Sequence, residues 1–286
     1  MTEVQDGEAL LGFKTDSIYE IVGRMAPGLM LDLGAASGAT AAQMLQASPQ
    51  SRVIGFEPFP GNLPFFKAKH ENDPRVRLVP KAVSNHNDTQ KFYVSRVVQD
   101  GKGSWKGMDG YSSVGQLVTD DHPHAQEAIT VETCRLDDEV HEKVAFMKID
   151  VQGAEYEVLD GARELFDRHG VDVMYIEFSG DQRILDFLAE RGYSFYDTEY
   201  MIVLKRLPDD SPDWRVVKRG TVSTGVPVGY GWPTGAPRDL AGYSQFVDAQ
   251  RRRLGHVQTD LVAVAPGALQ SFLAAAEETR RVHAPA

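Results

Sequence analysis

Cysteine is nearly absent from this 286-residue sequence, which contains a single one, Cys134. A lone cysteine excludes an internal disulfide framework and is typical of proteins in a reducing cytosol. Cys134 lies between Thr133 and Arg135 in a run with the pattern of a strand. We therefore expect it to be a packing residue rather than a nucleophile.

Long apolar runs are also absent. No stretch approaches the roughly 20 apolar residues that a membrane-spanning helix needs. The first 14 residues carry acidic side chains and lack the basic segment and apolar run of a secretory signal. These absences predict a soluble protein that has no membrane partner and lies in the cytoplasm.

Basic residues are fewer than acidic ones, since 30 Lys and Arg stand against 41 Asp and Glu and give a formal net charge of −11. This excess of negative charge disfavours a nucleic acid as the main partner. The composition, 42% hydrophobic and 25% charged, is ordinary for a globular protein. We expect one domain over residues 1–286, and the sequence leaves a homodimer open.

Apolar strand-like runs alternate with amphipathic helical runs along most of the chain, which predicts an α/β fold with a doubly wound, mostly parallel sheet. The predicted strands are 28–33, 52–56, 76–79, 145–149, 171–178, 200–204 and 260–264. The predicted helices are 39–47, 63–70, 155–169 and 184–191. Residues 1–27 are expected to form an N-terminal helical extension.

Two stretches interrupt this alternation. Residues 90–140 are too long for a single crossover helix and contain strand-like runs at 91–94 and 128–133, which predicts an insertion with a hairpin. Residues 207–238 are rich in proline and glycine, and we expect 207–258 to be a lid or a substrate-side segment. Its aromatic residues argue against plain disorder and are candidates for the substrate side: Trp214, Tyr230 and Trp232.

The most informative run is 145–155, where an apolar strand acquires Lys148 and Asp150 and then breaks at a glycine. Strand residues alternate between two faces, so Lys148 and Asp150 share one face and Met147 and Ile149 share the other. Burying a lysine is costly unless it is paired, and Asp150 is the nearest partner in sequence. Because ligands of parallel α/β sheets bind at the carboxyl ends of strands, these charges indicate a functional site.

A glycine turn over residues 31–38 follows the first predicted strand. Gly34 and Gly38 allow a ligand to approach the backbone, and the next helix offers unpaired N–H groups. Ala36 replaces the middle glycine of G-x-G-x-x-G, which weakens a pyrophosphate-binding interpretation and with it a nicotinamide-dependent dehydrogenase. Asp32, within this turn, suits a cationic ligand without phosphate.

Glu57 ends the next predicted strand, about 20 residues further on, where an acid accepts hydrogen bonds from ribose hydroxyls. The simpler alternative is a solvated carboxylate at the end of a strand. Taken with the glycine turn, Glu57 favours a ribose-containing ligand. Acidic surroundings would also tolerate the positive sulfonium of S-adenosylmethionine.

Together these features resemble class I S-adenosylmethionine-dependent methyltransferases, and specifically the FkbM family. The resemblance covers roughly residues 28–265 and depends on L-D-L-G-A-A-S-G at 31–38, G-F-E-P-F-P at 55–60 and M-K-I-D-V-Q-G-A-E-Y-E-V-L-D-G at 147–161. The segments I-E-F at 176–178 and D-L-V-A-V at 260–264 also fit. The resemblance implies a seven-stranded sheet with one antiparallel strand and, usually, O-methylation of a small molecule or glycan.

The resemblance also implies residue roles. Gly34 and Gly38 would line the methionine part of the cofactor, Glu57 would hold its ribose, and Asp150 would face the reaction centre. The residues expected to bind the cofactor are Asp32, Gly34, Gly38, Glu57, Ala82, Val83, Ser84 and Asp150, with 82–84 near the adenine. This chain departs from the family at Gln152, where glutamate is frequent, and over 207–238, which has no clear counterpart.

Methyl transfer to oxygen requires an acceptor close to the methyl group and removal of its proton. Asp150 is the candidate base or metal ligand, and Lys148 would hold Asp150 or stabilise an alkoxide. Alternatively, both residues only orient the loop and the cofactor. Further residues expected on the substrate side are Gln152, Glu155 and Glu177. If Asp150 and Glu177 converge, their oxygens would suit Mg²⁺.

The sequence therefore favours an enzyme that methylates a hydroxyl group of a small metabolite, such as a sugar or a polyketide-type product of natural product biosynthesis. Two alternatives stay open. One is methylation of nitrogen or of a carboxylate, and the other is a catalytically silent methyltransferase-like domain that binds a partner.

Overall fold

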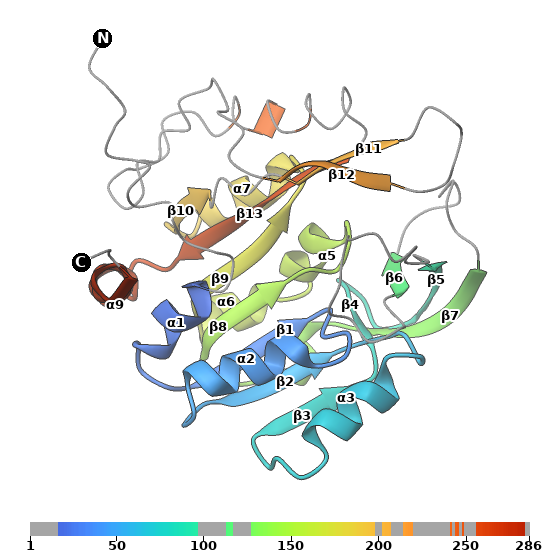
Figure 1. Ribbon diagram of the computed structural model, residues 1–286, viewed down its shortest axis with the longest axis horizontal. Coiled ribbons are helices and arrows are strands. Elements are labelled where there is room, and N and C mark those ends of the chain that lie inside the picture. Colours follow the sequence, from blue (N-terminus) through green and yellow to red (C-terminus); the bar gives the residue numbers. More distant parts are fainter. Residues whose placement is uncertain are drawn as a thin grey trace.

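The structure, a computed structural model, describes residues 17–96, 113–116, 127–197, 202–206, 214–219 and 256–283, together with 241, 244, 245 and 248. Figure 1 shows a twisted sheet with helices on both faces. This arrangement confirms the predicted doubly wound α/β fold. None of the helices in the described part of the chain is long and apolar enough to cross a membrane.

The main sheet contains nine strands within the described residues, in the order β12-β11-β13-β9-β8-β1-β2-β3, with β10 also paired to β13. Their bounds are β1 Leu29–Leu33, β2 Arg52–Phe56, β3 Val76–Val79, β8 Val144–Ile149, β9 Val171–Phe178, β10 Ser194–Asp197, β11 Ile202–Arg206, β12 Trp214–Arg219 and β13 His256–Val264. Strands β3, β2, β1, β8 and β9 are parallel, and β13 is antiparallel to β9. The predicted mostly parallel sheet with an antiparallel strand is therefore confirmed, and β12 extends its edge as a second antiparallel strand.

Two layers of helices cover this sheet. Successive side chains of each strand point to opposite faces, so a strand can pack against both layers. One layer contains α1 Ser17–Gly23, α2 Ala39–Ala47, α3 Leu63–His70 and α9 Leu269–His283, and the other contains α4 Leu136–Glu139, α5 Glu155–Asp160, α6 Arg163–Arg168 and α7 Gln182–Ala189. Figure 1 shows α2 and α3 in front of the sheet and α6 and α7 behind it. In β8, Phe146 packs with the first layer, and Met147 and Ile149 pack with the second.

A second, four-stranded sheet follows β3 in the order β4-β7-β5-β6. Its strands are β4 Ala82–Val83, β5 Thr89–Arg96, β6 Ser113–Gln116 and β7 Glu127–Cys134. The strands predicted at 91–94 and 128–133 lie within β5 and β7. Cys134 ends β7 as a buried thiol, and burial raises its pKa to about 12, so it is a packing residue as expected.

Two predicted elements were wrong in extent. The helix predicted over 155–169 is two helices, because the chain bends at Gly161, where a Cβ atom would lie 2.1 Å from the carbonyl oxygen of Ser84. The strand predicted over 200–204 corresponds to β11, which covers 202–206, and β10 at 194–197 was not predicted. Both pair with β13, whose nine residues are long enough to receive one after the other along the same edge.

Candidate functional site

The carboxyl ends of β1 and β2 are joined by the glycine turn. The amide groups of Gly34 and Ala35 both donate to the carbonyl oxygen of Phe56 at the end of β2, at 3.1 and 3.0 Å. Gly34, Ala36 and Gly38 adopt positive φ angles of 80°, 46° and 77°. The turn is therefore a fixed structure that carries the chain from β1 into the start of α2.

Protein atoms occupy the space where a side chain at either glycine of this turn would lie. A Cβ atom on Gly34 would lie 2.0 Å from the carbonyl oxygen of Asp150, and one on Gly38 would lie 2.8 Å from the ring of His70. The His70 Nε2–H group also donates to the Gly38 carbonyl oxygen at 2.8 Å. Protein contacts thus exclude side chains at Gly34 and Gly38, and the half-buried residues of the turn are Gly34, Ala36 and Ser37. That the glycines let a ligand approach the backbone stays a prediction.

Gly34→Ala is expected to lower the free energy of unfolding by more than about 2 kcal/mol, since it adds both a strained φ and a clash with backbone. Gly153→Ala is the matched control because Gly153 also has a positive φ, 106°, but nothing lies within 4 Å of its Cβ position. Urea unfolding monitored by circular dichroism measures both. Equal losses in the two variants would contradict the close approach of the β1 and β8 ends.

Glu57 follows β2 and holds the turn in place. Its Oε2 accepts a hydrogen bond from the Ala36 amide at 2.7 Å, and its Oε1 accepts one from the Phe59 amide at 2.8 Å. The residue is 5% exposed, and burial raises its pKa despite these hydrogen bonds. The Asn62 side chain also hydrogen-bonds this carboxyl group. Three of its roughly four lone-pair sites are then used, so Glu57 retains the capacity to accept one hydrogen bond from a ligand.

Lys148 lies at the centre of a buried ionic cluster. Its Nζ is 3.2 Å from Oδ2 of Asp150, 3.6 Å from Oδ1 of Asp32, and donates to the Gly34 carbonyl oxygen at 3.3 Å. Burial alone would lower the pKa of Lys148, but the two carboxylates outweigh it and the pKa is raised. The predicted pairing of Lys148 with Asp150 is confirmed, and the ammonium group remains charged.

Asp32 lies in a different place from the one expected of a cofactor-binding residue. It is completely buried, in the middle of the β1 pairing with β2 and β8, and the described structure gives neither carboxylate oxygen a hydrogen-bond partner. Burial raises its pKa, and Lys148 opposes that shift. Asp32 has no surface that a ligand could touch in this structure, so its contact is the ammonium group of Lys148.

Asp150 and Gln152 are the half-buried residues of the site, and Gln152 joins Asp150 to the buried Glu177. The Gln152 Nε2 group donates to Oδ1 of Asp150 at 2.5 Å and to Oε2 of Glu177 at 3.0 Å. The Asp150 side chain is 38% exposed. Burial acts against its charge, but Lys148 and the hydrogen bonds more than compensate and lower its pKa. Burial and the Asp150 charge raise the pKa of Glu177 well above its ordinary value.

Glu155, expected on the substrate side, is turned toward the backbone. It is 5% exposed, and its Oε1 accepts hydrogen bonds from the Val151 and Gly153 amides at 3.3 and 2.9 Å. Burial raises its pKa to about 7. Glu155 therefore fixes the turn that presents Gln152 rather than facing a ligand.

The remaining predicted residues lie further from this cluster or outside the described part of the chain. Ala82 and Val83 form β4 and are buried, and the buried Ser84 follows them. Trp214 is the first residue of β12, and its side chain is not described. Tyr230 and Trp232 lie outside the described residues.

Three polar residues near the cluster were missed by sequence reasoning. The Tyr175 hydroxyl donates to Oδ2 of Asp260 at 2.6 Å, and Tyr175 is the cross-strand partner of Lys148. Asp260 is in turn the cross-strand partner of Glu177. Tyr19, on α1, is buried, and the charges of Lys148 and Asp32 act on its hydroxyl. Alternation within β9 puts Tyr175 and Glu177 on one face, which is the signal that could have found the first of them.

The structure does not support the magnesium site considered at Asp150 and Glu177. Among the residues that it describes, no group of three or more His, Cys, Asp or Glu is arranged to hold a metal ion. The two carboxyl groups do converge, but the group between them is the Gln152 amide, a hydrogen-bond donor rather than a ligand for a hard cation.

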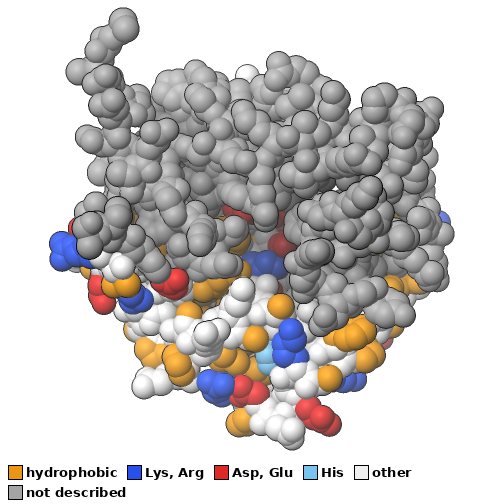
Figure 2. Space-filling model, in the orientation of Figure 1, with side chains coloured by type: hydrophobic (Ala, Val, Ile, Leu, Met, Phe, Trp, Pro, Cys, Tyr) orange, Lys and Arg blue, Asp and Glu red, His pale blue; other side chains and the backbone are white. Residues whose placement is uncertain are grey.

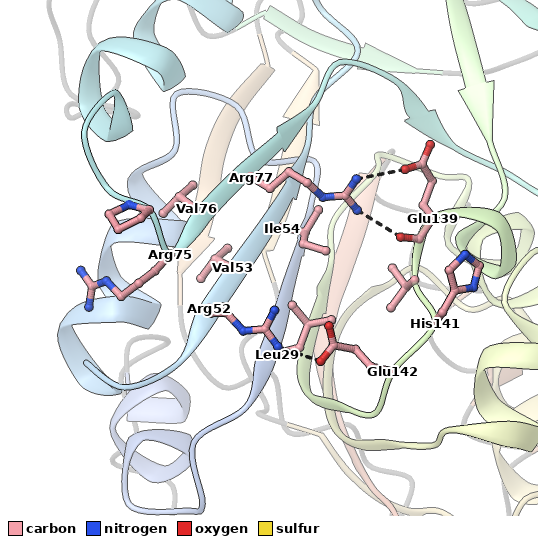
Figure 3. Close-up of a pocket in the computed structure, with 12 residues that line it drawn as sticks. Leu29, Arg52, Val53, Ile54, Arg75, Val76, Arg77, Glu139, His141 and Glu142 are labelled. Atoms are coloured by element: carbon pink, nitrogen blue, oxygen red, sulfur yellow. Dashed lines mark hydrogen bonds and ion pairs between the residues drawn. The ribbon is translucent and has the colours of Figure 1, made fainter.

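A hollow of ≈ 400 Å³ lies at the opposite ends of the strands, beside the first residues of β1, β2 and β3. Figure 3 shows that Arg52 and Arg77 point toward acids of the 139–142 segment, whereas Arg75 points away from it. Arg52 pairs with Glu142 at 2.7 Å, and Arg77 pairs with Glu139 at 3.3 Å. Because its charges already pair with each other and it lies away from the carboxyl ends, the hollow is a weaker candidate than the cluster. On the face of the molecule drawn in Figure 2, acidic and basic side chains lie next to one another at the centre.

Comparison with known proteins places the chain in a family. Residues 32–195 match the family described as "Methyltransferase FkbM domain". The chain is 31% identical over 167 residues to the 2-O-methyltransferase NoeI of Sinorhizobium fredii (strain NBRC 101917 / NGR234), a match that covers 55% of this chain and 65% of that relative. The chain thus spans less than two thirds of the relative's length.

Among solved structures, similar folds include the FkbM methyltransferase of Methylobacillus flagellatus KT, which is 18% identical with a TM-score of 0.41 over 66% of this chain and 42% of the other. The precorrin-6y C5,15-methyltransferase of Geobacter metallireducens GS-15 is 12% identical with a TM-score of 0.41 over 87% of this chain and 86% of the other. At these scores, the two structures add nothing to the topology described above.

Proposed function

We propose, because the chain belongs to the FkbM methyltransferase family, that it is a methyltransferase that depends on S-adenosylmethionine. We propose further that it methylates a hydroxyl group of a small molecule, such as a sugar or a polyketide-type natural product. The observation that carries the proposal is the Asp150 carboxylate, which is partly exposed at the end of β8 and kept ionised by Lys148. A fixed carboxylate at this position suits removal of a proton from a neutral acceptor.

The residues present fit the cofactor. Glu57, at the end of β2, is where a carboxylate accepts hydrogen bonds from ribose hydroxyls. The ionised Asp150 supplies the negative surroundings that a sulfonium tolerates. When bound, S-adenosylmethionine supplies the electrophilic methyl group.

Each residue of the cluster then has a separate task. Asp150 accepts the proton of the acceptor hydroxyl, whose oxygen must lie within hydrogen-bond distance of the carboxylate. Lys148 keeps Asp150 ionised and in place, and Asp32 keeps Lys148 in place. The acceptor is thereby oriented and deprotonated by groups that belong to two adjacent strands.

The relative named a 2-O-methyltransferase supports oxygen as the acceptor atom. The net charge of −11 supports a small-molecule acceptor rather than a nucleic acid. We also propose that the protein acts in the cytoplasm and without a membrane partner, while the sequence leaves a homodimer open.

The test is turnover of methyl-labelled S-adenosylmethionine by the purified protein with a panel of sugars, polyketide-type alcohols, amines and carboxylic acids. Mass spectrometric fragmentation of the product identifies the methylated atom. We expect a methyl ether. A methylamine or methyl ester would contradict the proposal, as would the absence of turnover with the panel and with extract of the host cell.

Glu57→Gln is expected to weaken binding of S-adenosylhomocysteine by about 10- to 100-fold, because one hydrogen bond to a charged group contributes about 1.5–3 kcal/mol. Isothermal titration calorimetry measures the affinity, and a thermal melt checks that the variant is folded. Glu142→Gln, which removes an exposed carboxylate from the other end of the strands, is the control and should bind like wild type. Unchanged affinity in folded Glu57→Gln would contradict the ribose assignment.

A further inference from the structure

Gln152 occupies an unusual backbone position between the two carboxyl groups of the site. It has a positive φ of 61°, uncommon for a residue with a side chain, and Gly153 follows with 106°. Glu155 fixes this turn by accepting hydrogen bonds from the amides on either side of Gln152. A strained conformation that the surrounding structure determines is typical of a functional position.

The strained turn aims one side-chain amide at two acids. Both N–H groups of the Gln152 Nε2 atom are used, one for Asp150 at 2.5 Å and one for Glu177 at 3.0 Å. Resting on the function proposed above, we propose that Gln152 is a positioning residue that holds the Asp150 carboxylate and the Glu177 carboxyl group side by side, with Asp150 as the proton acceptor. In this role Gln152 acts through the Asp150 carboxylate.

A neutral donor at this position limits the negative charge of the site. The charged and titratable groups that face the pair come from six elements: Lys148 on β8, Asp32 on β1, Tyr175 on β9, Asp260 on β13, Glu155 on α5 and Tyr19 on α1. Only Lys148 among these is a cation. A carboxylate at position 152 would add a further negative charge, raise the pKa of both Asp150 and Glu177, and remove the donor that joins them.

Glutamate has the shape of glutamine but lacks its N–H donors. A glutamate cannot donate to two carboxylates and would need a cation or shared protons between them. The glutamine of this chain performs the joining with hydrogen bonds alone. The substitution Gln152→Glu therefore tests whether these two hydrogen bonds position Asp150.

Gln152→Glu is the decisive variant because it exchanges the amide for a carboxylate of the same shape and keeps the backbone strain unchanged. The matched control is Gln182→Glu, since Gln182 also donates to an aspartate, Asp186, at 2.7 Å on the surface of α7. Two readouts are compared at a series of pH values. The first is the ¹³C NMR signal of the Asp150 carboxyl group, assigned with Asp150→Asn, and the second is kcat.

In Gln152→Glu, the midpoint of the Asp150 signal and the acidic limb of the kcat profile should both move up by about one pH unit or more. Binding of S-adenosylhomocysteine should stay unchanged, and Gln182→Glu should behave as wild type in all three measurements. An unmoved Asp150 midpoint in folded Gln152→Glu would overturn the proposal and leave Gln152 with a space-filling role. If no variant and no wild-type protein transfers a methyl group, the proposed function fails, while the NMR titration still decides the role of Gln152.

A second variant guards against a folding defect. Gln152→Asn tolerates the left-handed conformation better than most residues but is one methylene shorter, so it cannot reach both acids. We expect it to melt near the wild-type temperature, to keep its affinity for S-adenosylhomocysteine and to lose kcat. Full kcat in Gln152→Asn would count against the positioning role.

Discussion

Replacing Lys148 with methionine is expected to lower the free energy of unfolding by about 3–5 kcal/mol, the usual cost of removing one partner of a buried ion pair. Lys148 is the cation between Asp32 and Asp150, and Asp32 is completely buried. Without the ammonium group, Asp32 must stay charged without a counterion or take up a proton. Either outcome destabilises the folded state, as urea unfolding followed by circular dichroism will measure.

Two variants separate this explanation from loss of packing. Lys143→Met makes the same change in an exposed pair, with Asp172 at 2.9 Å, and should cost less than about 1 kcal/mol. Adding Asp32→Asn to Lys148→Met should recover about 2 kcal/mol, because the two positions are in contact and the buried charge is gone. A loss in Lys148→Met no larger than in Lys143→Met would show that Lys148 does not balance Asp32.

Asp150→Asn is expected to lower kcat by about 10²- to 10⁴-fold, the range that a general base contributes. The amide keeps the shape of the carboxylate and can still accept the Gln152 hydrogen bond, but it cannot accept the acceptor's proton. Affinity for S-adenosylhomocysteine should change little. Steady-state turnover with labelled S-adenosylmethionine and calorimetry on the same preparation give the two values.

The control for Asp150→Asn is Asp160→Asn, the same change at an aspartate that pairs with Arg163 at 2.8 Å at the end of α5. This variant should keep wild-type turnover. Wild-type turnover in Asp150→Asn itself would return Asp150 to the structural role that the sequence left open, in which it orients the loop and Lys148.

Much of this site could be predicted because its charges lie within short local patterns. Lys148 and Asp150 are two residues apart in a strand, and alternation alone puts them on one face, where the structure pairs them at 3.2 Å. Glu57 at the end of β2 could be recognised from its distance to the glycine turn, and its hydrogen bond to Ala36 joins the two segments. Spacing along the sequence thus predicts where β2 and β8 end and which charged side chains lie there.

Contacts that depend on three-dimensional packing could not be predicted. The carbonyl oxygen of Asp150 occupies the space where a Cβ atom of Gly34 would lie, and this contact joins residues that follow different strands. The hydrogen bond from the Tyr175 hydroxyl to Asp260 depends on the pairing of β9 with β13, and no local sequence pattern specifies that pairing. Asp32 was expected to contact the cofactor, but it is completely buried. The sequence of β1 alone does not show that α1 and α2 cover this strand.

The position of the cofactor tests the central claim, that methyl transfer takes place where β1, β2, β8 and β9 end. The direct measurement is a crystal structure of the protein with S-adenosylhomocysteine. We predict that its ribose hydroxyls lie within hydrogen-bond distance of the Glu57 carboxylate and that its sulfur lies on the Asp150 side of the glycine turn. S-adenosylhomocysteine bound in the hollow beside Arg52 and Arg77, with no contact to Glu57, would contradict the account.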